Sequence, residues 1–390
     1  MKKYIVVHSG ARDLYEVAKA LYKNNALGYL VTDDILLRKK YRNLFPKDKI
    51  KISLGGIIFR ILCQFIHSSK LHRLKDYFLG KTAGHLSRKK KMPLLAYSGY
   101  AYYAFRETKE SPKILFQFHP HCVTNKAIFD AELKKYPEIA KNLLLEEEYQ
   151  IPPKKVKHFI EEVKMADGYI AASSFTKQSL VNIGANPEKI TIAPYGVDLT
   201  NYPFVKRLIK KNEPLSFVFV GNYTQRKGIH YMLLACKRLQ DEGYIFNLKM
   251  TGRSKLDLEY LNSFGLKNLS IYYKLTHSEL IDLLHSSDVF LFPSLCEGFA
   301  FVIIEAMSTG LPIISTTRTA GNDIVNNGIE GFTIKPSSVE EIVEKMKYFI
   351  QNPSECERMG NNASQKAKSL TWENFEGKVI EGVKKAEKIL

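Results

Sequence analysis

The feature that most constrains the fold of this sequence is a repeated unit, in which a short apolar run leads through a polar loop into an amphipathic helix. Units of this kind begin at residues 2–22, 113–121 and 167–180. Ser173 and Ser174 stand at the start of the third helix, where short polar side chains cap free backbone amides. Strands that alternate with helices predict parallel sheets with helices on both faces.

The same alternation restarts after the polar stretch at 199–214, with strands expected at 216–220, 246–251 and 289–292 and a helix at 229–241. Because 390 residues exceed one ordinary core, two domains are expected. The predicted fold is α/β, with two Rossmann-like, doubly wound parallel sheets. We place the first domain at 1–198, a linker at 199–214, the second domain at 215–370, and a helix at 371–390 that returns to the first domain.

Two sequence patterns predict where helices of the second domain begin. Thr276-x-x-Glu279 and Ser337-x-x-Glu340 have the spacing of capping boxes. In doubly wound sheets, ligands bind beyond the carboxyl ends of the strands, so the loops that follow strands are the places to look for chemistry.

Composition predicts an intracellular globular protein rather than a secreted or membrane-spanning one. The sequence has no run of eighteen apolar residues and no signal-peptide pattern, which predicts a cytoplasmic protein. Its five cysteines are scattered singly without zinc spacing, so we expect reduced thiols.

The formal net charge of +18 is concentrated in residues 35–91, which hold sixteen Lys and Arg against two Asp. Apolar residues such as Ile58, Ile61 and Phe65 interleave with these cations, a pattern typical of amphipathic elements on anionic lipid. A peripheral position on the cytosolic face of the cell membrane is therefore expected. Nucleic acid would also suit the charge, but no recognition-helix signature accompanies it, and a basic face with no partner is the plain alternative.

Glu297 and Glu305 are eight residues apart, so on one continuous helix they would lie about 12 Å apart along its axis. Pro293 breaks the preceding strand and Gly298 permits a tight turn, which predicts a helix that starts near Phe299. Glu297 then projects from a loop and Glu305 from the helix. The free amides at 299–301 would face an anion.

Several motifs occur together in one order between residues 193 and 332. They are APYGVD at 193–198, RKG at 226–228, FLFPSLCEGFAFVIIEAMSTGLP at 290–312 and NNGIEGF at 326–332. This set resembles the retaining glycosyltransferases of family four. The resemblance implies the GT-B architecture, in which two Rossmann-like domains face a central cleft.

The resemblance also implies roles for individual residues. Glu305 would bind the donor ribose and Glu297 the sugar hydroxyls near the reacting carbon. Arg226 and Lys227 would neutralise the leaving diphosphate, and fixed cations suit the charge that builds up there. His119 would lie close to the donor sugar. The expected catalytic residues are thus His119, Glu297, Arg226 and Lys227.

The wider donor site takes in the loops around these residues. The family commonly has Gly-Arg where this chain has Gly221-Asn222, so the second phosphate cation is either missing or supplied by Arg253. In the first domain, Arg12 and His121 are the candidate acceptor contacts. The expected donor-binding residues are Gly10, Gly221, Asn222, Arg226, Lys227, Gly252, Arg253, Leu275, Glu297, Gly298, Phe299, Ala300, Phe301 and Glu305.

The predicted reaction moves a sugar from a nucleotide-diphosphate sugar to a hydroxyl of a glycan or lipid-linked glycan, as in bacterial surface polysaccharide or lipopolysaccharide synthesis. We expect no metal and no other cofactor, because the sequence has no Asp-x-Asp motif. The alternatives are a nucleotide-sugar epimerase on the same scaffold, a nucleic-acid-binding or DNA-glycosylating protein, and a non-catalytic scaffold.

Overall fold

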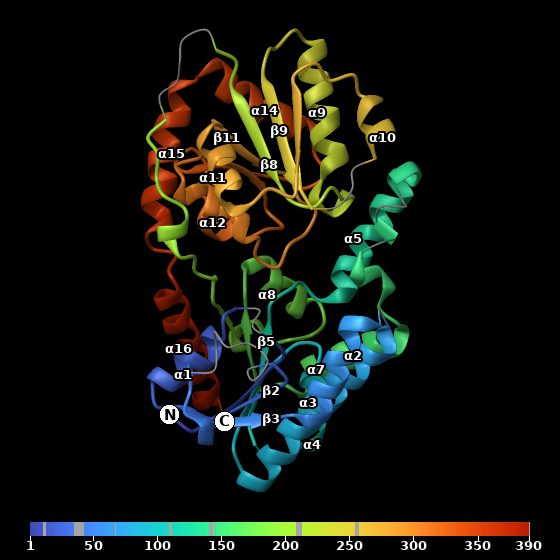
Figure 1. Ribbon diagram of the computed structural model, residues 1–390, viewed down its shortest axis with the longest axis vertical. Coiled ribbons are helices and arrows are strands. Elements are labelled where there is room, and N and C mark those ends of the chain that lie inside the picture. The colour runs from blue at the N-terminus through green and yellow to red at the C-terminus, as the bar shows by residue number, and fades with distance from the viewer. Residues whose placement is uncertain are drawn as a thin grey trace.

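The computed structural model describes residues 1–10, 13–34, 43–66, 68–108, 111–139, 143–144, 146–207, 213–253 and 257–389. Within these ranges the chain forms two α/β domains, stacked along the long axis of the molecule (Figure 1). Every described strand pair is parallel. The predicted fold class is confirmed.

The first domain is built on a seven-stranded sheet in the order β3-β2-β1-β4-β5-β6-β7. Its central strands are buried on both faces, as parallel strands covered by helices must be. The strands are β1 (Tyr4–His8), β2 (Leu27–Thr32), β3 (Ile50–Ile52), β4 (Leu94–Tyr97), β5 (Lys113–Gln117), β6 (Gly168–Ala171) and β7 (Ile190–Ile192). The helices are α1 (Glu16–Lys23), α2 (Leu54–Phe65), α3 (Ser69–Lys90), α4 (Ala101–Glu107), α5 (Cys122–Lys135), α7 (Pro153–Met165) and α8 (Ser174–Val181).

The second domain has a six-stranded sheet in the order β10-β9-β8-β11-β12-β13. Its strands are β8 (Ser216–Val220), β9 (Asn247–Gly252), β10 (Leu269–Tyr273), β11 (Val289–Phe292), β12 (Ile313–Thr316) and β13 (Gly331–Ile334). Its helices are α9 (Ile229–Asp241), α10 (Leu258–Asn262), α11 (His277–His285), α12 (Phe301–Ser308), α13 (Gly321–Ile324), α14 (Val339–Gln351) and α15 (Ser354–Ala367).

The last helix, α16 (Trp372–Ile389), packs on α1, β6 and β7 of the first domain. Both chain ends therefore lie on the first domain (Figure 1). The chain crosses between the domains twice, and the two crossings touch, because the Val197 amide donates to the Leu370 carbonyl at 3.0 Å. A Cβ at Gly196 would lie 2.2 Å from the backbone of Thr371, so this contact needs glycine.

Two helix starts differ from the sequence-based expectations. Helix α12 begins at Phe301 rather than near Phe299, because Ala300 adopts a left-handed conformation with φ of 71° and stands before the helix. Helix α14 is capped by Ser338, whose side chain accepts from the Glu341 amide, and not by Ser337. The capping box of Thr276 and Glu279 is present as predicted.

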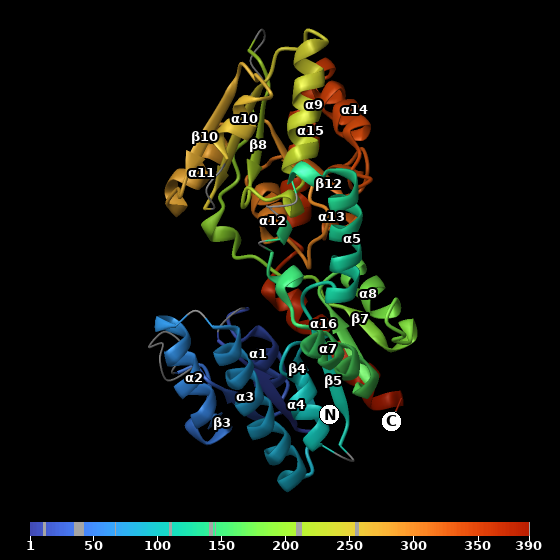
Figure 2. The ribbon, with the colours of Figure 1, turned by 90° about the vertical axis from the view of Figure 1, so that its right-hand side faces the viewer.

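In both sheets the strand order reverses beside the first strand, between β1 and β4 and between β8 and β11. Ligands of such sheets bind outside the carboxyl ends of the strands at this point. Those ends of the two sheets lie toward the domain junction (Figure 2). The described residues include no helix that is long and apolar enough to span a bilayer.

Candidate active site

Glu297 is the centre of the most highly charged contact at the domain junction. It follows β11 in the loop before α12, and only 6% of it is exposed. Its Oε1 accepts from Arg226 at 2.7 Å, from Lys227 Nζ at 2.6 Å and from the Ser294 hydroxyl at 2.9 Å. The structure therefore brings together three side chains that the sequence assigned to the donor site.

The environment of Glu297 keeps it ionised. Burial raises its pKa, but the charges of Arg226 and Lys227, with hydrogen bonds from Lys227 and Ser294, lower it to about 2. The pKa of Lys227 is lowered, because burial outweighs its attraction to Glu297. Arg226 and Lys227 are partly buried and pair with Glu297, and two cations held close together suit an anionic ligand.

The RKG turn and the loop of Glu297 hold each other in place. Gly228 has φ of 74°, and a Cβ there would lie 2.0 Å from the Pro293 carbonyl oxygen. The Arg226 carbonyl accepts from the Leu295 amide and the Ser294 hydroxyl, both at 2.8 Å. This packing explains why glycine follows the two cations and why Pro-Ser precedes the loop.

Glu146 of the first domain also contacts Arg226, with 2.8 Å between Oε2 and Nε. Nearby, Glu132 of α5 accepts from Gln225 at 3.3 Å and from the Tyr231 hydroxyl at 2.7 Å. The first domain thus places two carboxylates on the segment that carries the predicted phosphate cations. The sequence analysis did not single out either residue, because only tertiary folding joins them to the RKG turn.

We expect Glu146→Gln to bind a nucleoside diphosphate about three- to tenfold more tightly than the unmodified protein, because the variant removes an anion that competes for Arg226. Isothermal titration with UDP, GDP and ADP measures this change. Glu138→Gln, an exposed glutamate of the same segment, serves as the control. Weaker binding by Glu146→Gln would mean that Glu146 orients Arg226 rather than competing for it.

Glu305 lies in the second turn of α12 and is half-buried. The pKa of its carboxyl is raised, because the effect of burial exceeds that of the hydrogen bond from Tyr202. Tyr202 comes from the segment between the domains, immediately after the 3-10 turn at Leu199–Asn201. Glu305 is thus hydrogen-bonded to a tyrosine, whereas Glu297 forms ion pairs with two cations.

His119 follows β5 and lies against the loop of Glu297. A Cβ at Gly298 would be 2.0 Å from the Phe118 carbonyl oxygen and 3.0 Å from the His119 Cα. The Thr176 hydroxyl of α8 donates to the Gly298 carbonyl at 3.2 Å. Gly298 is thus a point where the two domains approach each other through backbone, and it brings His119 to the site.

His121 is buried and caps α5, since its Nδ1 accepts from the Val123 amide at 3.3 Å. Burial lowers its pKa to about 4. Its contact with an acceptor stays a prediction, while the capping role is visible in the structure.

The low pKa of His121 makes stability depend on pH. His121 has a pKa near 6.5 in the unfolded chain, so the unfolded chain binds the proton more tightly than the folded protein does. The free energy of unfolding is therefore at its maximum above pH 6.5 with respect to this residue, and it falls as the pH drops toward 4. We expect a loss of at most about 3 kcal/mol from this residue. Urea unfolding at pH 7, 5 and 4 should show that His121→Asn, which retains a capping oxygen, loses less stability over this range. An equal loss in both proteins would contradict the assignment.

The loop after β1 contains a buried polar network. Gly10 has φ of 73°, its carbonyl faces His8 Nδ1 at 2.6 Å, and its amide donates to Asp33 at 3.2 Å. His8 Nε2 lies 2.8 Å from Asp13, and Arg60 of α2 pairs with Asp33 at 3.1 Å. The pair Asp33-Asp34 directly after β2 was the sequence signal for this network, and it was missed. Arg12 lies outside the described residues.

The remaining predicted donor residues lie at the end of β9, in the loops after β8, β9, β10 and β11, and at the start of α12. A Cβ at Gly252 would be 2.3 Å from the Gly221 carbonyl oxygen, so these two loops touch through backbone. Asn222 and Arg253 are exposed, Leu275 is half-buried, and Phe299 is buried. Phe301 stacks on Tyr195 at 5.0 Å, which ties the start of α12 to the segment between the domains.

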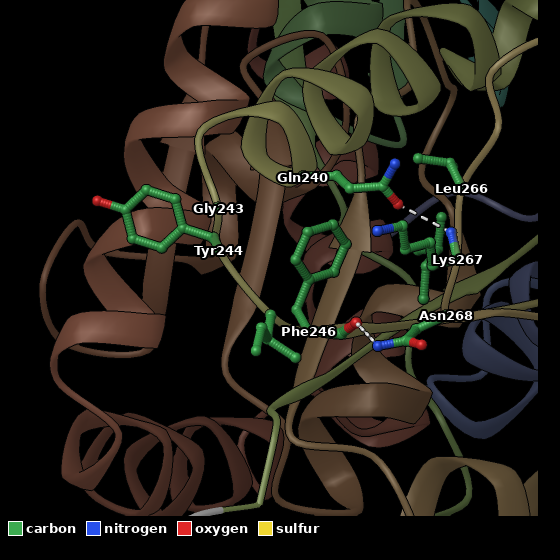
Figure 3. A pocket seen from close by; sticks show the side chains of 9 residues that line it. Gln240, Gly243, Tyr244, Phe246, Leu266, Lys267 and Asn268 are labelled. Atoms are coloured by element: carbon green, nitrogen blue, oxygen red, sulfur yellow. Dashed lines mark hydrogen bonds between the residues drawn. The ribbon is translucent and has the colours of Figure 1, made fainter.

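A separate pocket of about 350 Å³ lies at the opposite end of the second sheet (Figure 3). Phe246 and Asn268, which precede β9 and β10, line it together with Gln240 of α9. It contains none of the predicted site residues.

The fold and the cation-lined junction together define the GT-B architecture. Residues 204–366, in the second domain, match the family model described as Glycosyl transferases group 1. The crystal structure of Anabaena HepE in complex with UDP and glucose has a TM-score of 0.63 to this chain at 12% identity, over 98% of this chain and 100% of that one.

Two curated relatives are similar in sequence. The putative colanic acid biosynthesis glycosyltransferase WcaL of Salmonella typhimurium is 28% identical over 182 residues, which span 44% of each chain. The D-rhamnosyltransferase WbpZ of Pseudomonas aeruginosa is 24% identical over 358 residues, which span 84% of this chain and 91% of WbpZ. The alignment with WcaL thus covers less than half of that protein.

Proposed function

We propose that this protein is a retaining, family-four glycosyltransferase that moves a sugar from a nucleotide-diphosphate sugar to a hydroxyl of a glycan or lipid-linked glycan. The observation that carries the proposal is the cluster of Glu297, Arg226 and Lys227 at the carboxyl ends of β8 and β11. It offers two cations to a diphosphate and a carboxylate to sugar hydroxyls, side by side.

Each residue has a task in this proposal. Arg226 and Lys227 bind the diphosphate and stabilise the charge that it gains as it leaves. Glu297 accepts hydrogen bonds from the transferred sugar, and Glu305 accepts them from the ribose in place of Tyr202. His119 contacts the sugar from the first domain.

In the proposed reaction, the bond between the anomeric carbon and the phosphate oxygen breaks, and the acceptor oxygen bonds to that carbon on the same face. The proton of the acceptor hydroxyl passes to the departing phosphate oxygen, so no enzyme base is needed. Because the acceptor attacks from the face that the phosphate leaves, no enzyme nucleophile is needed either. The protein supplies positioning and fixed charge. We propose that the two cations perform this task without a metal ion.

The names of the relatives support a surface polysaccharide as the class of product. WcaL is described with colanic acid biosynthesis, and WbpZ as a rhamnosyltransferase. The basic segment at 35–91 supports an acceptor held at the cytosolic face of a bacterial membrane, with the protein bound there peripherally.

Release of nucleoside diphosphate from UDP-, GDP-, ADP- and TDP-sugars, measured with and without a bacterial lipid extract as acceptor, tests the proposal. We expect release from one donor that depends on the extract, survives EDTA and gives a product of unchanged anomeric configuration by NMR. Conversion of the nucleotide sugar without any acceptor would instead indicate an epimerase. Loss of release with EDTA would contradict the metal-free step.

A further inference from the structure

The outer face of α2 carries a stripe of exposed apolar side chains. Ile58 is 57% exposed and Phe65 is 79% exposed, and the stripe recurs at the spacing of one helical face. The α2 stripe consists of Leu54, Ile58, Ile61, Leu62 and Phe65.

The opposite face of α2 is firmly packed, which fixes the stripe outward. Phe59 stacks on Phe78 of α3 with 5.4 Å between ring centroids, and a Cβ at Gly55 would lie 2.5 Å from the Phe78 ring. Ser53 caps the helix by accepting from the Gly56 amide at 3.2 Å. The apolar residues are therefore exposed by a well-formed helix and not by a frayed segment.

Exposed cations flank the stripe in the sequence. Lys47 and Lys51 precede α2, and Lys70 opens α3; all three are exposed. Residues 43–91 contain twelve Lys and Arg but only two acidic residues, and one of these, Asp76, is buried against Lys155 at 2.9 Å. An apolar stripe flanked by cations complements a surface with anionic headgroups above hydrocarbon.

We propose that α2 is the element by which the first domain binds an anionic phospholipid bilayer, with the α2 stripe inserted at the interface and the neighbouring lysines on the headgroups. The inference rests on the proposed function in one respect, because a lipid-linked acceptor is the reason for the protein to bind a membrane. Figure 2 shows α2 at the outer edge of the first domain, where the second domain does not cover it.

The same helix reaches the polar network of the first domain. Arg60, on α2, pairs with Asp33 at 3.1 Å and with Asp34 at 3.0 Å. Its guanidinium would lie 3.2 Å from a Cβ at Gly10. One side chain of α2 thus connects the proposed membrane-binding helix to the loop in which an acceptor is expected, and this places the bilayer on the same side of the first domain as that loop.

Co-sedimentation of the full chain with vesicles tests the inference. We expect binding to vesicles of phosphatidylcholine with phosphatidylglycerol, little binding to phosphatidylcholine alone, and weaker binding at about 0.5 M salt. The double variant Ile58→Glu with Phe65→Glu should lower the partition coefficient at least about tenfold. Its matched control is Ile245→Glu with Leu258→Glu, two equally exposed apolar residues of the second domain that should leave binding unchanged.

Circular dichroism checks the fold of both variants, and a thermal-shift assay with the nucleotide-sugar donor is run on the same samples. Donor binding without vesicle binding by the unmodified protein would overturn the membrane inference and leave the proposed function standing. Vesicle binding without donor binding would overturn the proposed function and leave the membrane inference standing. If the stripe variant keeps vesicle binding but changes the molecular mass of the protein in solution, the stripe is a contact between two copies and the inference fails.

Discussion

Replacing Lys227 by methionine is expected to lower the turnover number by a factor on the order of 10² to 10³, a range typical for loss of one preorganised group that stabilises transition-state charge. Lys227 is 2.6 Å from Glu297 and its ammonium lies over the Phe292 ring at 5.0 Å. Methionine preserves the apolar stem and removes the charge. Affinity for the nucleoside diphosphate should fall as well, because one of two buried cations is lost.

The control is Lys237→Met on α9, an exposed lysine paired with Asp241. Its turnover should match that of the unmodified protein. Initial rates of nucleoside diphosphate release and titration calorimetry measure the two effects. Unchanged turnover in Lys227→Met, with the fold intact by circular dichroism, would remove Lys227 from the site.

Replacing Glu297 by glutamine is expected to lower turnover by a similar factor, on the order of 10² to 10³. Unlike Lys227→Met, this variant should not bind the nucleoside diphosphate more weakly. The amide retains the shape of the side chain but removes the charge that pairs with Arg226 and Lys227. Both cations then remain for the diphosphate, so its affinity should not fall. The loss should appear in kcat, because Glu297 acts on the transferred sugar.

A matched control is Glu242→Gln at the end of α9. This exposed carboxylate also pairs with two cations, Arg238 at 3.1 Å and Lys347. Neither of these cations is a predicted site residue. We expect no change in turnover there. If Glu297→Gln loses diphosphate affinity in proportion to turnover, the glutamate organises the cations and does not act on the sugar. Breaking a buried ion pair costs about 3 to 5 kcal/mol, so unfolding is measured in parallel.

Local sequence signals were sufficient for much of the fold. The buried strands at 4–8 and 289–292 and the capping box of Thr276 are encoded within a few residues, and the structure has them. The resemblance to a known family assigned Arg226, Lys227 and Glu297 to one site, and the structure places these three side chains in contact. Their roles in binding and catalysis stay predictions.

The sequence could not reveal contacts that join remote segments. Glu146 reaches Arg226 across 80 residues, and Tyr202 covers Glu305 from the segment between the domains. Neither has a local pattern. The start of α12 was placed too early, because no residue pattern around Ala300 signals its left-handed backbone.

The most direct test of the central claim is a thermal-shift titration with UDP-, GDP-, ADP- and TDP-sugars. A ligand that binds only the folded protein stabilises it by about 2.7 kcal/mol at one hundred times its Kd. We predict that one of these donors raises the Tm of the unmodified protein and of Lys237→Met, and that Glu305→Ala and Lys227→Met lose most of this rise. No shift with any of the four donors, or an equal shift in Lys227→Met, would contradict the account of a diphosphate-sugar site at Glu297, Arg226 and Lys227.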